Sequence, residues 1–283
     1  EISVGFTPDG SRILSCPLPR YHPNNDNNNH HNNTSCWSQT PRDSIFRVRG
    51  INYLNDRIKL PSAPSVFPCR GVDVYLTDDP IRHISRHPAM LGGKLHSNDD
   101  DTNDTFVVNF LLPFANFVSY FSIPPIETMP KNVAAVWTKF LAGDVEYRDA
   151  RLKLLPVVID GPWIVKKAVG TTPAVIGQKI PLQYYFTKGD GGKRKGTYEV
   201  DVIISASKIA KTILNVVKGH AKRLIIALAF IIEAAEESEL PETVLCSFQL
   251  HYLHLELCPR LPYYALDVDT DDDDDDGNGD DEM

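Results

Sequence analysis

The sequence has no hydrophobic run long enough to cross a membrane. Its longest apolar run is Leu224–Ile232, whereas a spanning helix needs roughly 20 residues. The N-terminus also lacks the basic flank and apolar block of a secretory signal peptide. It begins with Glu1 rather than Met, as a piece of a longer protein would. We therefore expect a cytoplasmic chain without a transmembrane segment.

Paired cysteines are absent as well. The 5 cysteines are scattered, and no two are spaced as C-x-x-C. This pattern indicates neither a zinc ribbon nor a disulfide framework. The Asn/His tract Asn24–Asn33 and the acidic run Asp271–Asp276 both lack the ligand spacing of a metal loop. We therefore expect no metal and no cofactor.

Recognisable catalytic motifs are also missing. The tetrapeptide Ser205–Lys208 fits S-x-x-K, but its S-D-N and K-T-G partners are absent, so a helix N-cap explains it better. The stretch Gly189–Thr197 lacks the spacing of a phosphate loop, which favours a basic hairpin tip. His254–Glu256 lacks the cysteine pair of a zinc deaminase. We expect no enzyme and no catalytic residues.

Basic residues are absent from the last stretch of the chain. Asp267–Met283 holds 11 acids and no Lys or Arg, so the remaining 26 acids face 29 bases and the net charge of −8 belongs to this stretch. A near-neutral body argues against a nucleic-acid partner. We expect an N-terminal extension over 1–39, one domain over 40–261 and a disordered acidic tail over 262–283.

What the sequence does contain is many strand-like segments and few helical ones. We predict strands over Ile45–Arg49, Phe106–Leu112, Phe117–Ile123, Leu152–Ile159, Trp163–Val169, Ile180–Phe186, Tyr198–Ile204 and Val244–Leu257. Helices are predicted over 130–141 and 144–151. This pattern predicts an α+β fold, with a largely antiparallel curved β-sheet packed on a long C-terminal α-helix. Its most specific form would be a START-like helix-grip.

The long C-terminal helix is predicted to begin at Ser205 or Ser207 and to continue through the apolar run Leu224–Ile232, with Glu233–Leu240 and Pro241 closing it. Apolar residues recur at helical spacing along one side. The opposite side carries a stripe formed by Lys208, Lys211, Asn215, Lys218 and Lys222. A cavity between such a helix and a curved sheet is a common place for an apolar ligand.

Basic and aromatic residues supply the candidate lipid-binding set. This set is Arg47, Arg49, Arg148, Arg151, Trp163, Lys193, Arg194 and Lys195. For Arg148 and Arg151 two interpretations stay open: salt bridges within the fold, or contacts to a phosphate or carboxylate headgroup. The three basic residues at 193–195 would touch anionic lipid heads from a hairpin tip.

Several segments, in order, resemble the C-terminal domain of the enhanced disease resistance 2 proteins of plants. They are Phe46–Gly50 with Tyr53, Leu54 and Lys59, then Phe140–Pro156, Gly161–Val165, Val169–Pro173, Tyr198–Val202 and Leu240–Glu242. The similarity covers about Arg42–Leu257. In plants this domain often follows pleckstrin-homology and START domains, and those proteins are associated with membranes and lipids. The resemblance carries over no catalytic residue.

Together these observations predict a non-catalytic, lipid-binding or peripheral membrane module that holds an apolar ligand between sheet and helix. The alternative is a protein-interaction or scaffold domain with a solid core and no ligand. Protein partners are not indicated. The acidic tail would either repel an anionic membrane or compete with it for the lysines.

Overall fold

The computed structural model describes residues 35–40, 45–87, 103–170, 173–189 and 195–261, together with Leu18. It also describes the backbone of a short N-terminal hairpin, β1 (Ser3–Phe6) with β2 (Arg12–Ser15). The Asn/His tract Asn24–Asn33 and the expected tail over 262–283, with its acidic run Asp271–Asp276, lie outside the described residues.

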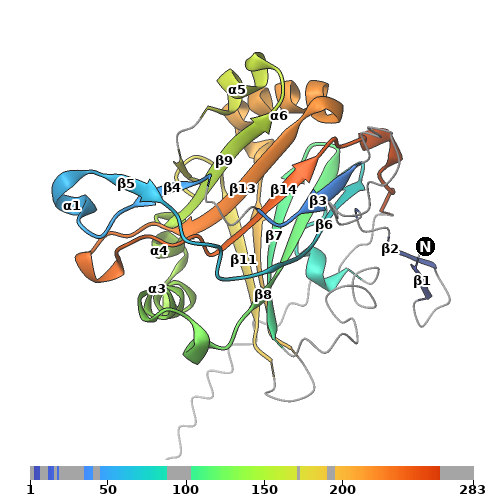
Figure 1. Ribbon diagram of the computed structural model, residues 1–283. Coiled ribbons are helices and arrows are strands. Elements are labelled where there is room, and N and C mark those ends of the chain that lie inside the picture. Colours follow the sequence, from blue (N-terminus) through green and yellow to red (C-terminus); the bar gives the residue numbers. More distant parts are fainter. Residues whose placement is uncertain are drawn as a thin grey trace, which may run out of the picture.

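Two five-stranded sheets form the body of the molecule (Figure 1). The first has the order β10-β9-β13-β14-β3, made of β10 (Ala174–Val175), β9 (Leu152–Asp160), β13 (Ile225–Ile232), β14 (Cys246–His251) and β3 (Cys36–Ser38). The second has the order β11-β12-β7-β8-β6, made of β11 (Leu182–Thr187), β12 (Thr197–Val202), β7 (Asp104–Leu112), β8 (Ala115–Ile123) and β6 (Cys69–Leu76).

Strand pairing in these sheets is mostly antiparallel, as predicted. The one parallel pair in the described sheets joins β12 to β7, with Thr197 opposite Thr105. A further hairpin is formed by β4 (Arg47–Arg49) and β5 (Lys59–Pro61), with the short helix α1 (Tyr53–Asp56) between them. The mixed fold with largely antiparallel sheets is confirmed, but as two sheets rather than one curved sheet.

The helices are α3 (Lys131–Ala142), α4 (Val145–Asp149), α5 (Trp163–Val169) and α6 (Lys208–His220). The predictions of helices over 130–141 and 144–151 are confirmed. Pro130 occupies the residue before α3 without a capping hydrogen bond. At the start of α4, the Asp144 side chain accepts a hydrogen bond from Tyr147 N–H. No helix in the described part of the chain is long and apolar enough to cross a bilayer.

The predicted long C-terminal helix is wrong beyond His220. Helix α6 ends at His220, and the apolar run forms β13, which pairs with β9 on one side and β14 on the other. A strand covered on both faces is apolar without alternation, so its periodicity does not distinguish it from a buried helix. A START-like helix-grip is therefore not confirmed.

Two predicted strands also differ. The segment Trp163–Val169 forms helix α5 instead of a strand, with Val165 fully buried and Val169 packed against the core. An i,i+4 apolar pair after a proline is helical spacing. The expected strand Val244–Leu257 is strand only over β14, because Tyr252 takes a positive φ of 46° and the 3-10 turn η7 (Leu255–Leu257) follows.

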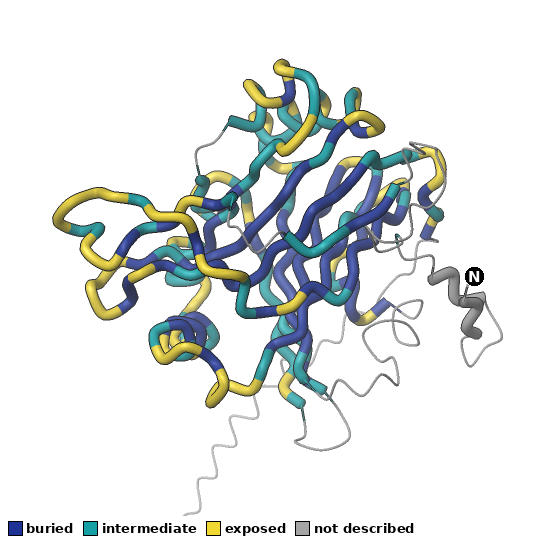
Figure 2. Tube along the Cα trace, in the orientation of Figure 1, coloured by how far each residue is buried: buried dark blue, intermediate teal, exposed yellow. Residues whose placement is uncertain are grey.

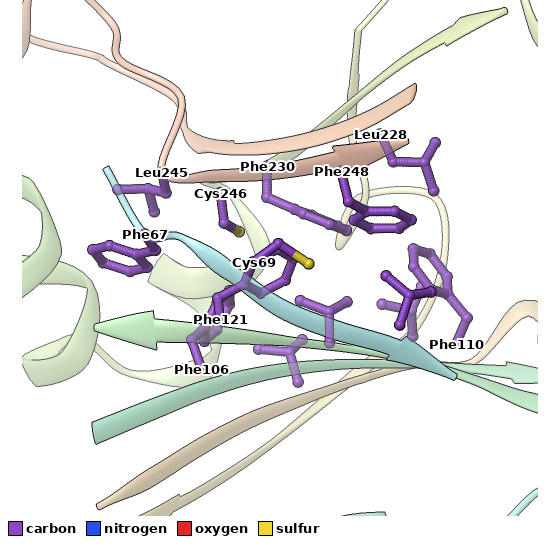
Figure 3. Close-up of a cluster of buried hydrophobic side chains, with 14 of the residues drawn as sticks. Phe67, Cys69, Phe106, Phe110, Phe121, Leu228, Phe230, Leu245, Cys246 and Phe248 are labelled. Atoms are coloured by element: carbon purple, nitrogen blue, oxygen red, sulfur yellow. The ribbon is translucent and has the colours of Figure 1, made fainter. Parts of the chain in front are cut away.

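Aromatic side chains fill the space between the two sheets (Figure 3). Phe121 of β8 lies 6.4 Å from Phe230 of β13, ring centre to ring centre, and Phe117 lies 5.7 Å from Phe248 of β14. Such tilted and edge-on contacts are preferred geometries for aromatic pairs. Figure 2 shows the central strands of the two sheets buried along most of their length. The intersheet space is a packed core.

Strand β3 lies just before the expected domain start at residue 40. Trp37 of β3 pairs with Leu250 of β14, is only 4% exposed and belongs to the main core. Residues 36–38 therefore form part of the first sheet.

Candidate functional site

Arg49 lies in a buried network of ion pairs. Its guanidinium is 2.9 Å from the Glu233 carboxylate, and its Nε is 3.6 Å from Glu242. The Lys153 ammonium is 2.8 Å and 2.9 Å from the same two carboxylates. Lys153 and Glu242 are each 4% exposed. Because two cations face two anions at close range, the Arg49 charge is already compensated within the fold.

Arg151 belongs to the continuation of this network. Its Nη1 is 2.9 Å from Glu239 Oε2 in the 3-10 turn η6 (Glu237–Glu239), and Lys139 of α3 lies 3.0 Å from the other oxygen. Burial acts to raise the pKa of Glu239, but the Ala235 N–H and the two cations outweigh it and lower that pKa to about 2. Arg151 therefore forms a salt bridge within the fold, with a partner 88 residues away along the chain.

Arg148 fixes the end of helix α3. It donates hydrogen bonds of 3.0 Å and 2.8 Å to the carbonyl oxygens of Phe140 and Leu141. Its guanidinium also lies 4.6 Å from the centre of the Phe186 ring. The carbonyls in the last turn of a helix have no partners within the helix. Arg148 therefore joins α3 to the second sheet.

Arg47 lies apart, on the hairpin of residues 45–62, which we call the β4–β5 finger. The finger projects from the body in Figure 1. Arg47 is exposed, and its Nη2 donates a 2.6 Å hydrogen bond to the Lys59 carbonyl. Ile51 and Ile58 are 56% and 54% exposed near its tip. The finger thus presents apolar and basic side chains together.

Trp163 lies on a second exposed patch, which we call the α5–α6 surface (residues 163–167 and 208–211). Helices α5 and α6 pack against each other at one end of the molecule (Figure 1). Trp163 is 71% exposed, Ile164 44% and Ile209 of α6 76%. Lys167 Nζ lies 5.9 Å from the Trp163 ring centre. Large apolar side chains rimmed by lysines mark an interaction surface.

The local sequence explains why these side chains point outward. Gly161 has a φ of +149°, and a Cβ there would lie 2.8 Å from Leu224 Cδ1, so the turn before α5 favours glycine. Val165 is the buried residue of α5, which leaves Trp163 on the open side. Ser207 Oγ accepts a 3.3 Å hydrogen bond from Ala210 N–H, as expected of an N-cap.

The basic hairpin tip is at the other end of the second sheet. Strands β11 and β12 pair antiparallel as predicted, but Lys193 and Arg194 lie outside the described residues, and Lys195 is half-buried. Thr197 pairs with Thr105 at the start of β7, whereas Phe114, beyond its far end, contacts α6. Nine strand residues separate these ends by roughly 30 Å. The described members of the predicted set therefore do not converge on one site.

Two buried carboxyl groups on β12 were not predicted. Glu199 and Asp201 are both fully buried beneath residues 77–87. Their oxygens accept hydrogen bonds of 2.8–3.0 Å from the backbone N–H groups of residues 83–85, and Asn109 Nδ2 donates to Asp201 at 2.7 Å. Burial, and then the neighbouring Glu199 charge, raises the pKa of Asp201 well above its usual value.

This pair predicts a loss of stability with rising pH. A carboxyl whose folded pKa is raised binds more protons in the folded than in the unfolded chain. The free energy of unfolding then falls as pH rises from about 4 through the folded pKa. Asp201→Asn should make the free energy of unfolding less dependent on pH and should be more stable than the natural chain at higher pH. Urea unfolding at about pH 5 and about pH 8 measures this difference in free energy. Identical pH slopes in the two proteins would contradict the assignment. Asp78→Asn, at a carboxylate 89% exposed, is the control.

Among the described residues, no group of three or more His, Cys, Asp or Glu side chains is placed to hold a metal ion. His254 Nδ1 lies 3.4 Å from Glu256, whose carboxylate also pairs with Lys222 at 2.5 Å. The His254–Glu256 pair thus belongs to a surface ion pair.

Comparison with known proteins identifies the family. The profile described as "Protein ENHANCED DISEASE RESISTANCE 2, C-terminal" matches residues 37–254. A curated relative from Arabidopsis thaliana, "Protein ENHANCED DISEASE RESISTANCE 2-like", is 29% identical over 223 residues, which cover 78% of this chain and 29% of that protein. The chain thus spans less than a third of the relative's length. No solved structure matches. The chain belongs to the family of enhanced disease resistance 2 C-terminal domains.

Proposed function

We propose that this domain is a non-catalytic peripheral membrane module that docks on anionic lipid through the α5–α6 surface. The observation that carries the proposal is the exposure of Trp163 and Ile209, 71% and 76%, on two adjacent helices. Tryptophan is enriched at membrane–water interfaces, because its ring is apolar and its N–H is polar. The exposed isoleucine of the neighbouring helix adds apolar area.

Lysines around these anchors supply the electrostatic part of the proposal. Lys166, Lys167 and Lys208 are exposed, and Lys211 is half-buried. In the part of the chain that the structure describes, none of the four has a carboxylate within 4.0 Å. Each such charge near an anionic leaflet is worth about 1 kcal/mol. Attraction and insertion would therefore act at the same face.

The proposal puts the lipid at the surface rather than between sheet and helix. Ring contacts across the two sheets, such as Phe110 with Phe230 at 6.1 Å, occupy the space where an internal apolar ligand would lie. The same packed core also supports the alternative of a scaffold domain. For that alternative the exposed isoleucines of the β4–β5 finger would be the contact to a protein.

Vesicle flotation tests the proposal. The full chain should float with vesicles of phosphatidylcholine and phosphatidylserine, and less with phosphatidylcholine alone. Trp163→Ser with Ile209→Ser should weaken binding about tenfold or more, because burying one large apolar side chain is worth about 1.5–3 kcal/mol. Both side chains are exposed, so folding should be unaffected.

The matched control is Ile51→Ser with Ile58→Ser on the β4–β5 finger, which removes two similarly exposed apolar side chains. This variant should bind vesicles like the natural chain. If only the finger variant lost binding, the finger and not the α5–α6 surface would be the docking site. If the full chain failed to float at low salt, the membrane proposal would fail and the scaffold alternative would stand.

A further inference from the structure

Part of the lysine stripe predicted from the sequence lies on α6. Lys208, Lys211 and Lys218 are on this helix, whereas Lys222 lies beyond its end in the 3-10 turn η5 (Ala221–Arg223) and pairs with Glu256. Lys208 and Lys218 are exposed and Lys211 is half-buried. Leu214, three residues after Lys211 and four before Lys218, packs against the core beside them, and Val217 packs against it on the side opposite Lys208. Among the described residues, these three lysines have no carboxylate partner within 4.0 Å. We call Lys208, Lys211 and Lys218 the α6 lysine face. Lysines spaced in this way on one helix repel one another, so binding of an anionic group to them is favoured.

The described chain ends beside this face. Leu261 N–H donates a 2.9 Å hydrogen bond to the Leu76 carbonyl at the end of β6. Its neighbour Arg260 lines an open pocket of about 400 Å³ together with Lys218 and Phe114. In that pocket Lys218 Nζ lies 3.6 Å from the Phe114 ring centre. The described chain therefore ends next to a pocket that Lys218 of α6 also lines.

The continuing sequence has the complementary charge. Asp267–Met283 carries 11 acids and no base. The five residues between Leu261 and Asp267 span roughly 20 Å when extended, and the 13 residues of α6 span about 20 Å. The first acids therefore reach any part of the α6 lysine face.

We propose that the acidic tail Asp267–Met283 binds the α6 lysine face of its own domain and competes there with anionic membranes. The inference rests on the proposed function for its consequence, since the same helix contributes to the α5–α6 surface. The contact itself needs only opposite charge and reach. Because the charges are exposed, the contact weakens as salt screens it.

The contact is tested first without any membrane. A labelled synthetic peptide of residues 262–283 is titrated with the chain truncated after Leu261, and its fluorescence anisotropy is read at low and high salt. We expect saturable, salt-sensitive binding. Lys208→Ser, Lys211→Ser and Lys218→Ser together should weaken it about tenfold, because three exposed charge pairs are lost. The control variant carries Arg47→Ser, Arg57→Ser and Lys59→Ser on the β4–β5 finger. It should bind the peptide as the natural domain does.

The consequence is tested with phosphatidylserine-containing vesicles. The truncated chain should bind them several-fold more tightly than the full chain, and added peptide 262–283 should reverse the gain. A gain that the peptide does not reverse would mean that the tail only repels the membrane, and would overturn the proposal. Peptide binding without vesicle binding would instead overturn the proposed function and leave the tail contact standing. Equal binding of the peptide by the natural domain and by the lysine variant would contradict the contact.

Discussion

Replacing Glu242 by alanine is expected to remove about 3–5 kcal/mol from the free energy of unfolding. The Glu242 side chain is 1% exposed and pairs with Lys153 at 2.9 Å. It also accepts hydrogen bonds from the backbone N–H groups of Arg49 and Ala234. Alanine would leave a buried ammonium short of one partner and two buried N–H groups without an acceptor. Urea unfolding followed by circular dichroism measures the loss.

Glu236 supplies the matched control in the same network. It pairs with Lys139 at 3.3 Å, but its side chain is 59% exposed. Exposed pairs contribute about 0–1 kcal/mol, so Glu236→Ala should cost far less than Glu242→Ala. Glu242→Gln keeps an acceptor oxygen and should fall between the two. Equal losses for the buried and the exposed glutamate would contradict the account of this network.

Replacing Trp137 by alanine is expected to cost a similar amount, about 3–5 kcal/mol. This side chain of α3 is 2% exposed and lies 5.1 Å from Phe67 and 5.5 Å from Phe106, ring centre to ring centre. It also stacks on Phe140, 5.8 Å away. Removing the indole would leave a cavity where the helix meets the second sheet. The loss would appear as a lower urea midpoint with an unchanged slope.

Trp163 is the control for the tryptophan prediction. It is 71% exposed, so Trp163→Ala should change the free energy of unfolding by no more than about 0.5 kcal/mol. The two variants separate the uses of tryptophan in this chain, since one should unfold the protein more easily and the other should affect vesicle binding alone. A large loss of stability in Trp163→Ala would mean that α5 anchors the fold rather than a membrane.

Local patterns predicted the hairpins well and the covered strand poorly. Phe106–Leu112 and Phe117–Ile123 were assigned to adjacent strands because a proline turn separates two β-rich runs, and β7 and β8 pair in this way. Leu224–Ile232 carries no alternation, because β13 lies between two strands and is covered on both faces. Only the neighbouring sheet distinguishes such a run from a buried helix.

The candidate site was only partly visible in the sequence for a related reason. A sequence shows that Arg49 is charged, but its carboxylate partner Glu242 lies 193 residues away. Glu199 and Asp201 alternate with valines, as the polar face of a strand would, and only the covering segment 77–87 makes them buried. Trp163 could be singled out for its residue type, whereas its exposure follows from the fold.

The parallel pairing of β7 with β12 also has a consequence for the time scale of synthesis. Asp104 accepts a hydrogen bond from Gly196, 92 residues further along the chain. At about 5–20 residues per second, a ribosome needs roughly 5–20 s to add that length. Throughout this interval the edge of β7 that later pairs with β12 has no strand partner. The distance along the chain therefore sets how long a nascent polypeptide must be kept from pairing with another copy.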